Sequence, residues 1–248
     1  MKYVILAAGQ GSRFVKEGVN TPKPMVDILG RPMIERLIGV LMECGAESIH
    51  IVTNSKMDSL NSHLNHLKNE KNLPLDIRPI VSDNSFYSLS EACKGVDGKF
   101  IAMTTDAIFP TAEFKRYVKA VEACAPAEVV MGLTEFVDDE SPLYAKLTAD
   151  GAEVVDYRYG GEPFPGKVIV SAGLYGLTGD ALATATSVRY PESLSDFQRI
   201  LAAETDIKVT PYTFSKAFDV DCTHDRVEAE KFVAEVNGET HVKPLANV

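Results

Sequence analysis

Long hydrophobic runs, closely spaced cysteines and excess positive charge are all absent from this 248-residue sequence. No segment reaches the roughly 18 apolar residues that a membrane span requires, and the apolar stretch at the N-terminus is too short for a signal peptide. The four cysteines form no CxxC pair, so the sequence suggests neither a zinc site nor a disulfide framework. We therefore expect a cytoplasmic protein that binds no membrane and keeps its cysteines reduced.

Basic residues are outnumbered, because 25 lysines and arginines stand against 35 aspartates and glutamates, a formal net charge of −10. This balance argues against a nucleic-acid footprint spread over the whole surface and leaves room only for a local basic pocket. The charge is also uneven: residues 1–31 hold five basic and two acidic side chains, a sum of +3, which leaves −13 for the rest of the chain. Positive charge therefore gathers near the N-terminus.

The first half of the chain alternates between short apolar runs and amphipathic segments. An apolar run of four to eight residues predicts a buried strand, whereas apolar residues at helical spacing predict a helix. The resulting βαβαβ rhythm is typical of a parallel sheet in an α/β protein. The expected strands are residues 3–8, 48–54, 75–81 and 99–109, and the expected helices are residues 33–44, 57–69 and 114–124.

Beyond residue 125 the rhythm changes to consecutive strand-like runs, which suggests an added antiparallel or mixed section. These runs cover residues 127–136, 143–149, 152–159 and 167–177, and a helix is expected at 226–236. No repeat or linker divides the chain, so we predict one domain over residues 1–248. Within it we distinguish a first half, residues 1–125, a second half, 126–225, and a C-terminal helix and tail, 226–248.

A glycine-rich loop, Ala8-Gly9-Gln10-Gly11-Ser12-Arg13, follows the first expected strand. Such a loop presents backbone N–H groups to phosphate without obstruction by side chains. It matches neither common nucleotide motif, since a Rossmann fingerprint needs glycine where Phe14 stands and the GxxxxGK[ST] of a P-loop is absent. Further along, Pro22 and Pro24 restrict the backbone on both sides of Lys23, so that its ammonium can be aimed.

The combined pattern of LAAGxGxR, then PKPM, then LGRPMI resembles the nucleotidyltransferase superfamily that makes nucleotide sugars and related nucleoside diphosphate conjugates. The resemblance implies a Rossmann-like, three-layer fold of the glycosyltransferase-A type, with a mixed, mostly parallel sheet. It also implies that a phosphate monoester attacks the α-phosphorus of a nucleoside triphosphate (NTP) and releases pyrophosphate. Arg13, Lys23 and Asp106 would then be the catalytic residues.

Such a transfer requires the protein to position the reactants and to neutralise charge, commonly through a divalent metal held by carboxylates. Asp106 follows an apolar strand, at the carboxyl end where α/β proteins bind ligands. Asp219 and Asp221 lie two apart on an extended stretch and so share a face. The resemblance implies that Asp106 binds Mg²⁺ together with one of this pair, and we favour Asp221.

The resemblance makes residues 1–125 the nucleotide-binding half and residues 126–225 the acceptor-binding half, and it also assigns the remaining site residues. The segment 82–92 would read the base and ribose, although Ser88 equally suits the N-cap of the following helix, with Glu91 completing a capping box. Gly173 and Tyr175 lie in a strand that would face the acceptor. The expected nucleotide-binding residues are Leu6, Ala7, Ala8, Gly9, Gly11, Ser12, Arg13, Lys23, Asn84, Ser88 and Leu89.

The sequence therefore predicts a Mg²⁺-dependent nucleotidyltransferase whose partners are an NTP and a phosphorylated small molecule, of the sugar 1-phosphate or phosphocholine type. Two alternatives remain open at this stage: an enzyme of the molybdenum cofactor guanylyltransferase type, and a non-catalytic relative that senses nucleotides. The base, the acceptor and the oligomeric state are not determined by the sequence.

Overall fold

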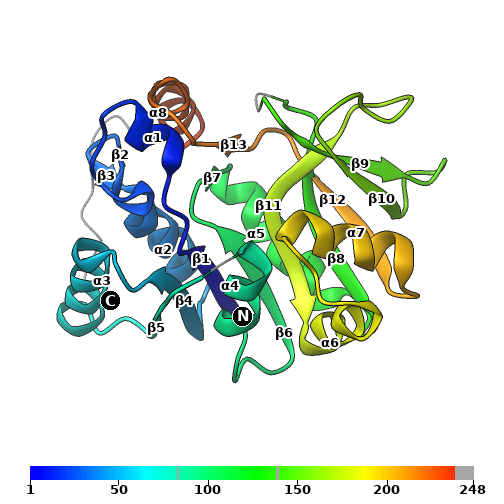
Figure 1. Ribbon diagram of the computed structural model, residues 1–248, viewed down its shortest axis with the longest axis horizontal. Helices are drawn as coiled ribbons and strands as arrows, with labels where there is room; N and C mark the ends of the chain where they lie inside the picture. The colour runs from blue at the N-terminus through cyan, green and yellow to red at the C-terminus, as the bar shows by residue number, and fades with distance from the viewer. Residues whose placement is uncertain (83, 138–139, 238–248) are drawn as a thin grey trace.

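A nine-stranded sheet forms the centre of the molecule, which is described by a computed structural model over residues 1–82, 84–137 and 140–237 (Figure 1). The strands follow the order β10-β9-β11-β6-β1-β4-β5, and β8 pairs with both β11 and β12. Their bounds are β1 Lys2–Ala7, β4 Ser48–Asn54, β5 Leu75–Ile80, β6 Lys99–Thr104, β8 Glu128–Thr134, β9 Leu143–Leu147, β10 Val154–Tyr159, β11 Val170–Thr178 and β12 Lys208–Phe214.

Strand direction confirms the predicted mixed, mostly parallel sheet. β1 pairs in parallel with β4 and with β6, and β4 pairs in parallel with β5. β11 runs antiparallel to β6 and to β8, while β12 is parallel to β8. Taken together, the pairings show that β10 and β11 run in the opposite direction to the other seven strands of this sheet. The carboxyl ends of β1, β4 and β6 therefore meet at one edge.

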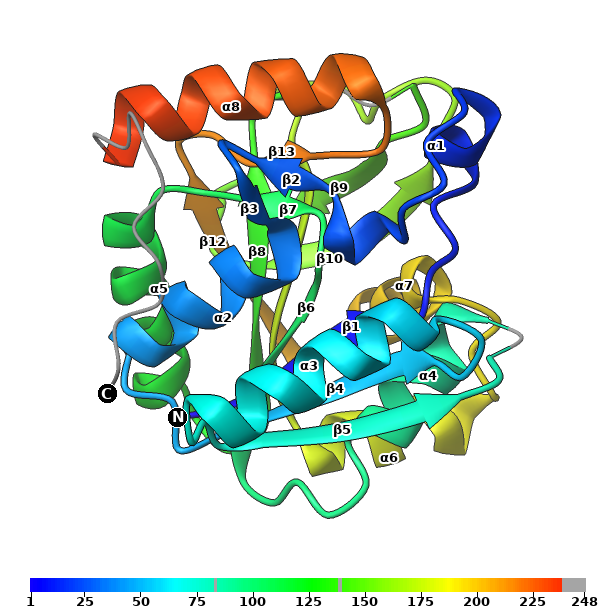
Figure 2. The same cartoon turned by 90° about the vertical axis from the view of Figure 1, so that its left-hand side faces the viewer.

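Helices cover both faces of the sheet, which gives the three layers expected for this fold class (Figures 1 and 2). One apolar cluster joins the sheet to α2, α3 and α5, and a second joins it to α4, α6 and α7. The helices on the first face are α2 Met33–Glu43, α3 Asp58–Glu70 and α5 Thr111–Ala123; those on the second are α4 Ser85–Ala92, α6 Gly179–Val188 and α7 Leu194–Glu204.

The short elements gather at the carboxyl edge of the sheet. The helix α1 Ser12–Lys16 and the 3-10 turn η1 Lys23–Met25 follow β1, and β2 Asp27–Ile28 forms a hairpin with β3 Arg31–Pro32. Two further short strands, β7 Ala107–Ile108 and β13 Phe218–Asp219, pair with each other. The last helix, α8 Thr223–Asn237, begins three residues before the predicted start. The predicted tail, 238–248, lies outside the described residues.

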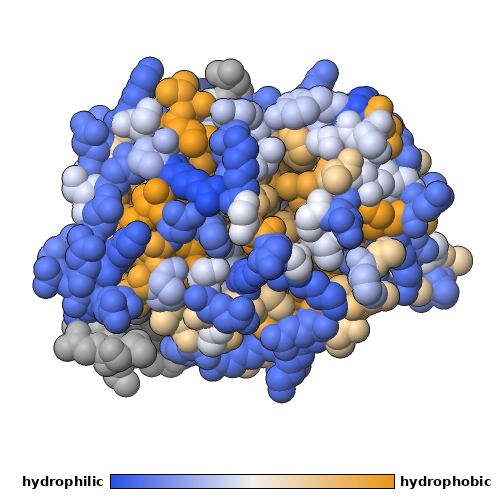
Figure 3. Space-filling model, turned by 90° about the horizontal axis from the view of Figure 1, so that it is seen from below, coloured by the Kyte–Doolittle hydropathy of each residue, from blue (hydrophilic) through white to orange (hydrophobic). Residues whose placement is uncertain are grey.

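The second half of the chain agrees with the prediction in its strands and differs in its helices. β8, β9, β10 and β11 occupy the four strand-like runs. The sequence reading did not anticipate α6 or α7, which cover the second face of the sheet (Figure 1). In the described part of the chain, no helix is long and apolar enough to cross a bilayer. Figure 3 shows one face with hydrophilic residues over most of its outline and hydrophobic residues in separate patches.

Close strand packing around β8 predicts that Gly132→Ala destabilises the protein. A Cβ at this position would lie 2.7 Å from the Cβ of Leu174 and 3.2 Å from its carbonyl oxygen. Overpacking of this kind costs about 1–3 kcal/mol, measurable as a loss of unfolding free energy in urea.

The matched control is Gly179→Ala at the start of α6, where a Cβ would meet nothing within 4 Å. This substitution should leave stability unchanged or raise it by about 0.4–1 kcal/mol, because it restricts the unfolded chain. Equal stabilities for the two variants would show that the sheet has room beside Gly132.

Candidate active site

Four charged side chains meet at the carboxyl edge of the sheet. The Lys23 ammonium donates to Oδ2 of Asp106 and to Oδ1 of Asp221. Arg13 Nη1 donates to the other oxygen of Asp221, at 2.8 Å. These residues come from four separate segments, namely α1, η1, the turn after β6 and the turn after β13. One ammonium thus joins two carboxylates that are far apart in the sequence.

The glycine-rich loop has its shape because Lys23 lies directly beneath it. Gly11 has a φ of 63°, a left-handed conformation that favours glycine. A Cβ on Gly11 would lie 2.7 Å from the Cβ of Lys23. Pro22 precedes the 3-10 turn that begins with Lys23, and Pro24 lies within it. Gly11 and the two prolines therefore place the stem of Lys23 against the loop and direct its ammonium to the carboxylates.

Burial makes this charge cluster strongly coupled. Lys23 is only 7% exposed, and burial by itself would lower the pKa of its ammonium. The negative charges of Asp106, Asp219 and Asp221 outweigh that effect, so the pKa of Lys23 lies above its usual range. For Asp106 burial would raise the pKa, but the charge and hydrogen bond of Lys23 lower it. Lysine and aspartate are therefore both ionised at neutral pH.

A small apolar cluster anchors all four segments that carry the charges. Phe14 follows Arg13, Ile108 lies two residues after Asp106, and Val220 precedes Asp221. Val26 and Ile28 extend the Lys23 segment into the same cluster, which α8 closes with Ala229, Phe232 and Val233. Because each charged residue lies within three residues of an apolar anchor in the sequence, packing of this cluster fixes the relative positions of the charges.

Two hollows meet at Asp106. The loop cleft, of about 560 Å³, is lined by the glycine-rich loop, Lys23, Asp221 and the start of α4. The β11 cavity, of about 270 Å³, is lined by β11, Phe136, Asp219 and α7. Residues that line both are Ser85, Thr104, Asp106 and Leu194. Both volumes are of the size that holds small molecules, and their junction lies at the charge cluster.

Most of the residues predicted to bind nucleotide line the loop cleft. Ala7 and Leu89 do not: Ala7 is buried in the apolar cluster under α2, and Leu89 in the one under α4. The residues that line the cleft are Leu6, Ala8, Gly9, Gly11, Ser12, Arg13, Lys23, Asn84 and Ser88.

The predicted capping role of Ser88 is wrong. α4 begins at Ser85, and its N-cap is Asn84, whose side chain accepts from the backbone N–H of Tyr87 at 2.7 Å. Ser88 lies inside the helix, where its hydroxyl lies 2.6 Å from that of Ser82. The helix therefore starts four residues earlier than a cap at Ser88 would allow.

The two candidate aspartates of the 219–221 segment differ in their contacts. Asp221 lines the loop cleft and contacts Lys23 and Arg13. Asp219 pairs with Ala107 through β13 and lines the β11 cavity instead. Both carboxylates also line a third hollow, beside Arg13, and the negative charges of both raise the pKa of Lys23.

The predicted acceptor-side residues line the β11 cavity. Gly173 lies in a bulge of β11 with a φ of 69°, and a Cβ there would lie 2.7 Å from the hydroxyl oxygen of Thr104. Tyr175 follows on the same strand, 4% exposed. The bulge thus brings the β11 backbone next to the end of β6, close to Asp106.

The sequence reading missed part of the lining. Asn54, at the end of β4, lines the loop cleft, and Gln198 of α7 lines the β11 cavity. A signal for α7 was present: Ser193 caps it by accepting from the N–H of Asp196, and its buried residues recur at helical spacing. Gln198 is 1% exposed, and its Oε1 accepts from the hydroxyl of Ser171 at 3.0 Å.

The donor set suits a cation that completes its coordination from a ligand. Within the described residues there is no group of three or more side chains able to hold a metal. Asp106 and Asp221 nevertheless share one cationic partner, and Oδ1 of Asp106 is buried with no hydrogen-bond partner in the described chain. Mg²⁺ is commonly held by one or two carboxylates, with phosphate and water as the other ligands, so these residues fit it.

A family model described as "MobA-like NTP transferase domain" matches residues 3–168. The chain is 37% identical over 90 residues to a choline-phosphate cytidylyltransferase of Streptococcus pneumoniae, covering 36% of this chain and 38% of that protein. It is 30% identical over 109 residues to a bifunctional protein GlmU of Methanococcus aeolicus, covering 44% and 25%. The chain thus spans well under two thirds of the length of these relatives.

The fold is also found in a solved structure, the inositol-1-phosphate CTP transferase from T. maritima. The TM-score is 0.78 at 17% identity, and the alignment covers 98% of each chain. At this identity the likeness concerns the fold, and it extends over both halves of the chain, including β8–β12 and α8.

The coupled cluster predicts that Lys23→Met destabilises the protein at neutral pH. The substitution leaves Asp106 buried without its cationic partner, which costs about 3–5 kcal/mol of unfolding free energy. In the wild type the lowered pKa of Asp106 contributes stability above its unfolded pKa, and this is lost as pH falls through the folded value. In the variant the unpaired carboxylate has a raised pKa, so protonation relieves its penalty. The difference between the two proteins should therefore begin to shrink above pH 4, where Asp106 of the variant takes up its proton, and continue to shrink down to the lowered pKa of the wild type.

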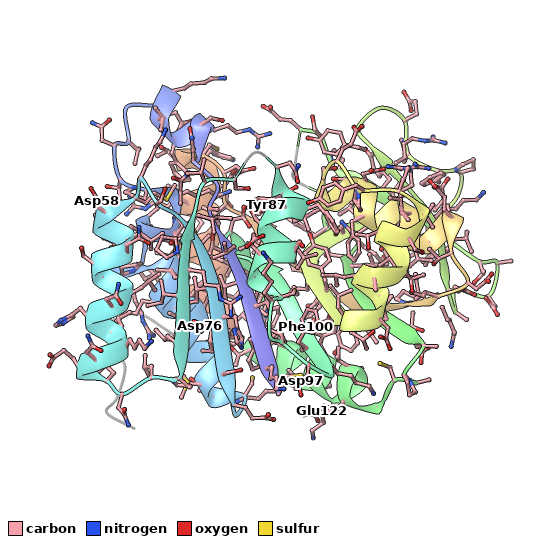
Figure 4. All side chains as sticks on the ribbon, turned by 60° about the horizontal axis from the view of Figure 1, so that its bottom comes forward. Asp58, Asp76, Tyr87, Asp97, Phe100 and Glu122 are labelled. Carbon is pink, nitrogen blue, oxygen red and sulfur yellow. The ribbon has the colours of Figure 1, made fainter. Side chains whose placement is uncertain are left out.

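Lys2→Met is the matched control, because Lys2 pairs with the exposed Asp97. Asp97 lies just before β6, at the opposite end of the sheet from the site (Figure 4). Denaturant titrations between pH 3 and 8 should show little effect of this variant. A Lys23→Met loss that is independent of pH would contradict the assignment of the cost to Asp106.

Proposed function

The chain belongs to the family of MobA-like NTP transferase domains, and on that premise we propose that it is a Mg²⁺-dependent nucleotidyltransferase. It joins a nucleoside triphosphate to a phosphorylated small molecule and releases pyrophosphate. The observation that carries this proposal is the Lys23 ammonium, which holds Asp106 and Asp221 at the point where two hollows meet. A reaction between two bound substrates requires such a junction.

In the proposed reaction a phosphate oxygen of the acceptor attacks the α-phosphorus of the triphosphate. The bond from that phosphorus to the α–β bridging oxygen breaks, and its electrons leave with pyrophosphate. The protein supplies no covalent partner; it aligns the two substrates and offsets their negative charge. The backbone from Gly9 to Arg13 holds the triphosphate, and Lys23 contacts the α-phosphate or the attacking phosphate.

Asp106 and Asp221 are the proposed metal-holding residues, and Asp219 borders the acceptor. Mg²⁺ bound there would neutralise charge that develops on the phosphate oxygens. Arg13 and Lys23, which pair with these carboxylates in the present structure, then turn to phosphate oxygens. The site thereby exchanges its internal ion pairs for ion pairs with substrate and metal, and no charged group is left buried without a partner.

The nucleotide occupies the loop cleft in this proposal. Leu6 and residues 8–12 line it, as do the short polar side chains of Asn54, Ser82, Asn84 and Ser88. Amide and hydroxyl groups of this kind read the edges of a base. They do not by themselves select one base, so the choice among nucleotides is left to measurement.

The acceptor occupies the β11 cavity. The described lining contains two carboxylates, Asp106 and Asp219, and neither lysine nor arginine. It also contains the aromatic residues Phe136, Tyr159 and Tyr175. Carboxylates and aromatic faces attract organic cations, so this lining favours a phosphorylated acceptor whose other end is an amine or quaternary ammonium over a sugar 1-phosphate. The choline-phosphate cytidylyltransferase relative supports the same choice.

A cytoplasmic location completes the proposal, since nucleoside triphosphates and Mg²⁺ are plentiful there. The described cysteines are all unpaired, which agrees with a reducing compartment.

The proposal predicts release of pyrophosphate when the purified protein is given Mg²⁺, each common NTP in turn, and a panel of acceptors. Phosphocholine and 2-aminoethyl phosphate should be used faster than glucose 1-phosphate. Lys23→Ala and Asp106→Ala should each reduce the rate by at least about 100-fold, because each removes a group that offsets phosphate charge. A coupled pyrophosphate assay measures all of these rates.

Asp97→Ala serves as the control, since Asp97 is exposed and far from the site. Chelation of Mg²⁺ should abolish release in the wild type. NTP binding without turnover on any acceptor would refute the enzyme and favour a nucleotide sensor, whereas turnover on a molybdopterin alone would favour the guanylyltransferase alternative.

A further inference from the structure

The segment that carries Arg13 has few anchors of its own. α1 is five residues long, and Phe14 is its one buried residue. Val15 is 56% exposed, and Gly18 ends the turn with a φ of 84°. A helix of this length is not stable by itself, so the position of Arg13 depends on contacts made outside the segment.

Glu17, at the end of α1, makes one such contact. Its Oε2 accepts from the backbone N–H of Thr223 at 2.8 Å and from the Thr223 hydroxyl at 2.6 Å. Thr223 is the first residue of α8, whose N-terminus lies beside α1 (Figures 1 and 2). Hydrogen bonds from the Thr223 side chain and backbone lower the pKa of Glu17, so the group is ionised at neutral pH. A carboxylate at a helix N-terminus is favoured by its unpaired N–H groups and dipole.

Asp225 makes a similar contact within the segment that carries Asp221. The carboxylate of Asp225 accepts from the N–H groups of Asp221 and Cys222, at 2.9 and 3.0 Å. Glu17 therefore accepts from the next N–H along the chain, that of Thr223. Together the two carboxylates fix the backbone that presents Asp221.

Two contacts consequently connect α1 to the segment that runs from Asp221 into α8. Arg13 contacts Asp221, and Glu17 contacts Thr223. Arg13 and Glu17 are four residues apart, so they lie on one face of the short helix. A bound triphosphate would compete with only one of these two contacts. Arg13 and Asp221 line the loop cleft, where a triphosphate would engage both. Glu17 is not among the described residues that line this cleft. Glu17 borders a neighbouring hollow, which it shares with Arg13, Asp221 and Asp225.

We propose that Glu17 is a positioning residue, which holds the phosphate-binding loop against the segment of Asp221 while Arg13 leaves Asp221 for the triphosphate. The proposal rests on the proposed function of the site. Without Glu17, the loop would have neither of these two contacts with the Asp221 segment once Arg13 binds the triphosphate. The affinity for NTP would then fall, while the acceptor side, which Glu17 does not border, would be unaffected.

The test compares Glu17→Ala with Glu17→Gln, since a glutamine amide oxygen still accepts from both groups of Thr223. We expect Glu17→Ala to raise the KM for NTP by about tenfold, the effect of losing one charge-assisted hydrogen-bond pair. The KM for the acceptor and the midpoint of thermal unfolding should stay near their wild-type values. Glu17→Gln should recover most of the NTP affinity. Glu43→Ala, which removes an exposed carboxylate elsewhere, is the matched control.

Hydrogen exchange at residues 221–223 and direct binding of Mg-NTP give readouts that do not need turnover. If the wild type binds Mg-NTP but releases no pyrophosphate, the proposed function fails, and the role of Glu17 is still decided by these two measurements. Faster exchange and weaker binding in Glu17→Ala alone support it. An unchanged affinity, a loss equal to that of Glu43→Ala, or a loss that Glu17→Gln does not restore would overturn it.

Discussion

The contact on which the rest of the site depends is the Lys23 ammonium between Asp106 and Asp221. It brings together the turn after β6 and the turn after β13, and its burial makes the cost of separating the charges high. The Lys23 stem leaves no room for a side chain at position 11, which explains the glycine there. The apolar cluster under α8 then holds the four charged segments in one arrangement.

This arrangement also explains how an acidic protein can accept a polyanion. The basic residues near the N-terminus are not displayed as an open positive patch, since Arg13 and Lys23 are paired with carboxylates. Under the proposed function those carboxylates take a metal ion and release the two cations to phosphate. On that proposal, ion pairs within the protein are replaced by ion pairs with substrate and metal when the substrate binds. The net charge of −10 then does not repel the substrate from the site itself.

Much of this was predictable from local patterns in the sequence. Apolar runs identified β1, β4, β5 and β6, and the glycine-rich loop with the flanked lysine located the first half of the site.

Two kinds of feature could not be predicted from local sequence patterns. The partners of Lys23 lie 83 and 198 residues away, and their contact depends on the sheet order. The contact of Asp219 with the β11 cavity depends on the pairing of β13 with β7, which local sequence patterns do not reveal. The second helical layer was missed because α6 and α7 follow a run of strands, although α7 carries a clear N-cap.

The exchange of ion pairs is tested most directly by calorimetric titration of CTP, UTP, GTP and ATP into the wild type and Asp221→Asn, with Mg²⁺ and with EDTA. In EDTA the variant should bind its preferred triphosphate more tightly than the wild type, by about tenfold, because Arg13 and Lys23 are released from Asp221. With Mg²⁺ the order should reverse, since a metal-holding carboxylate is lost. If Asp221→Asn binds metal-free triphosphate no more tightly than the wild type, the cations are not held back by Asp221 and the account is contradicted.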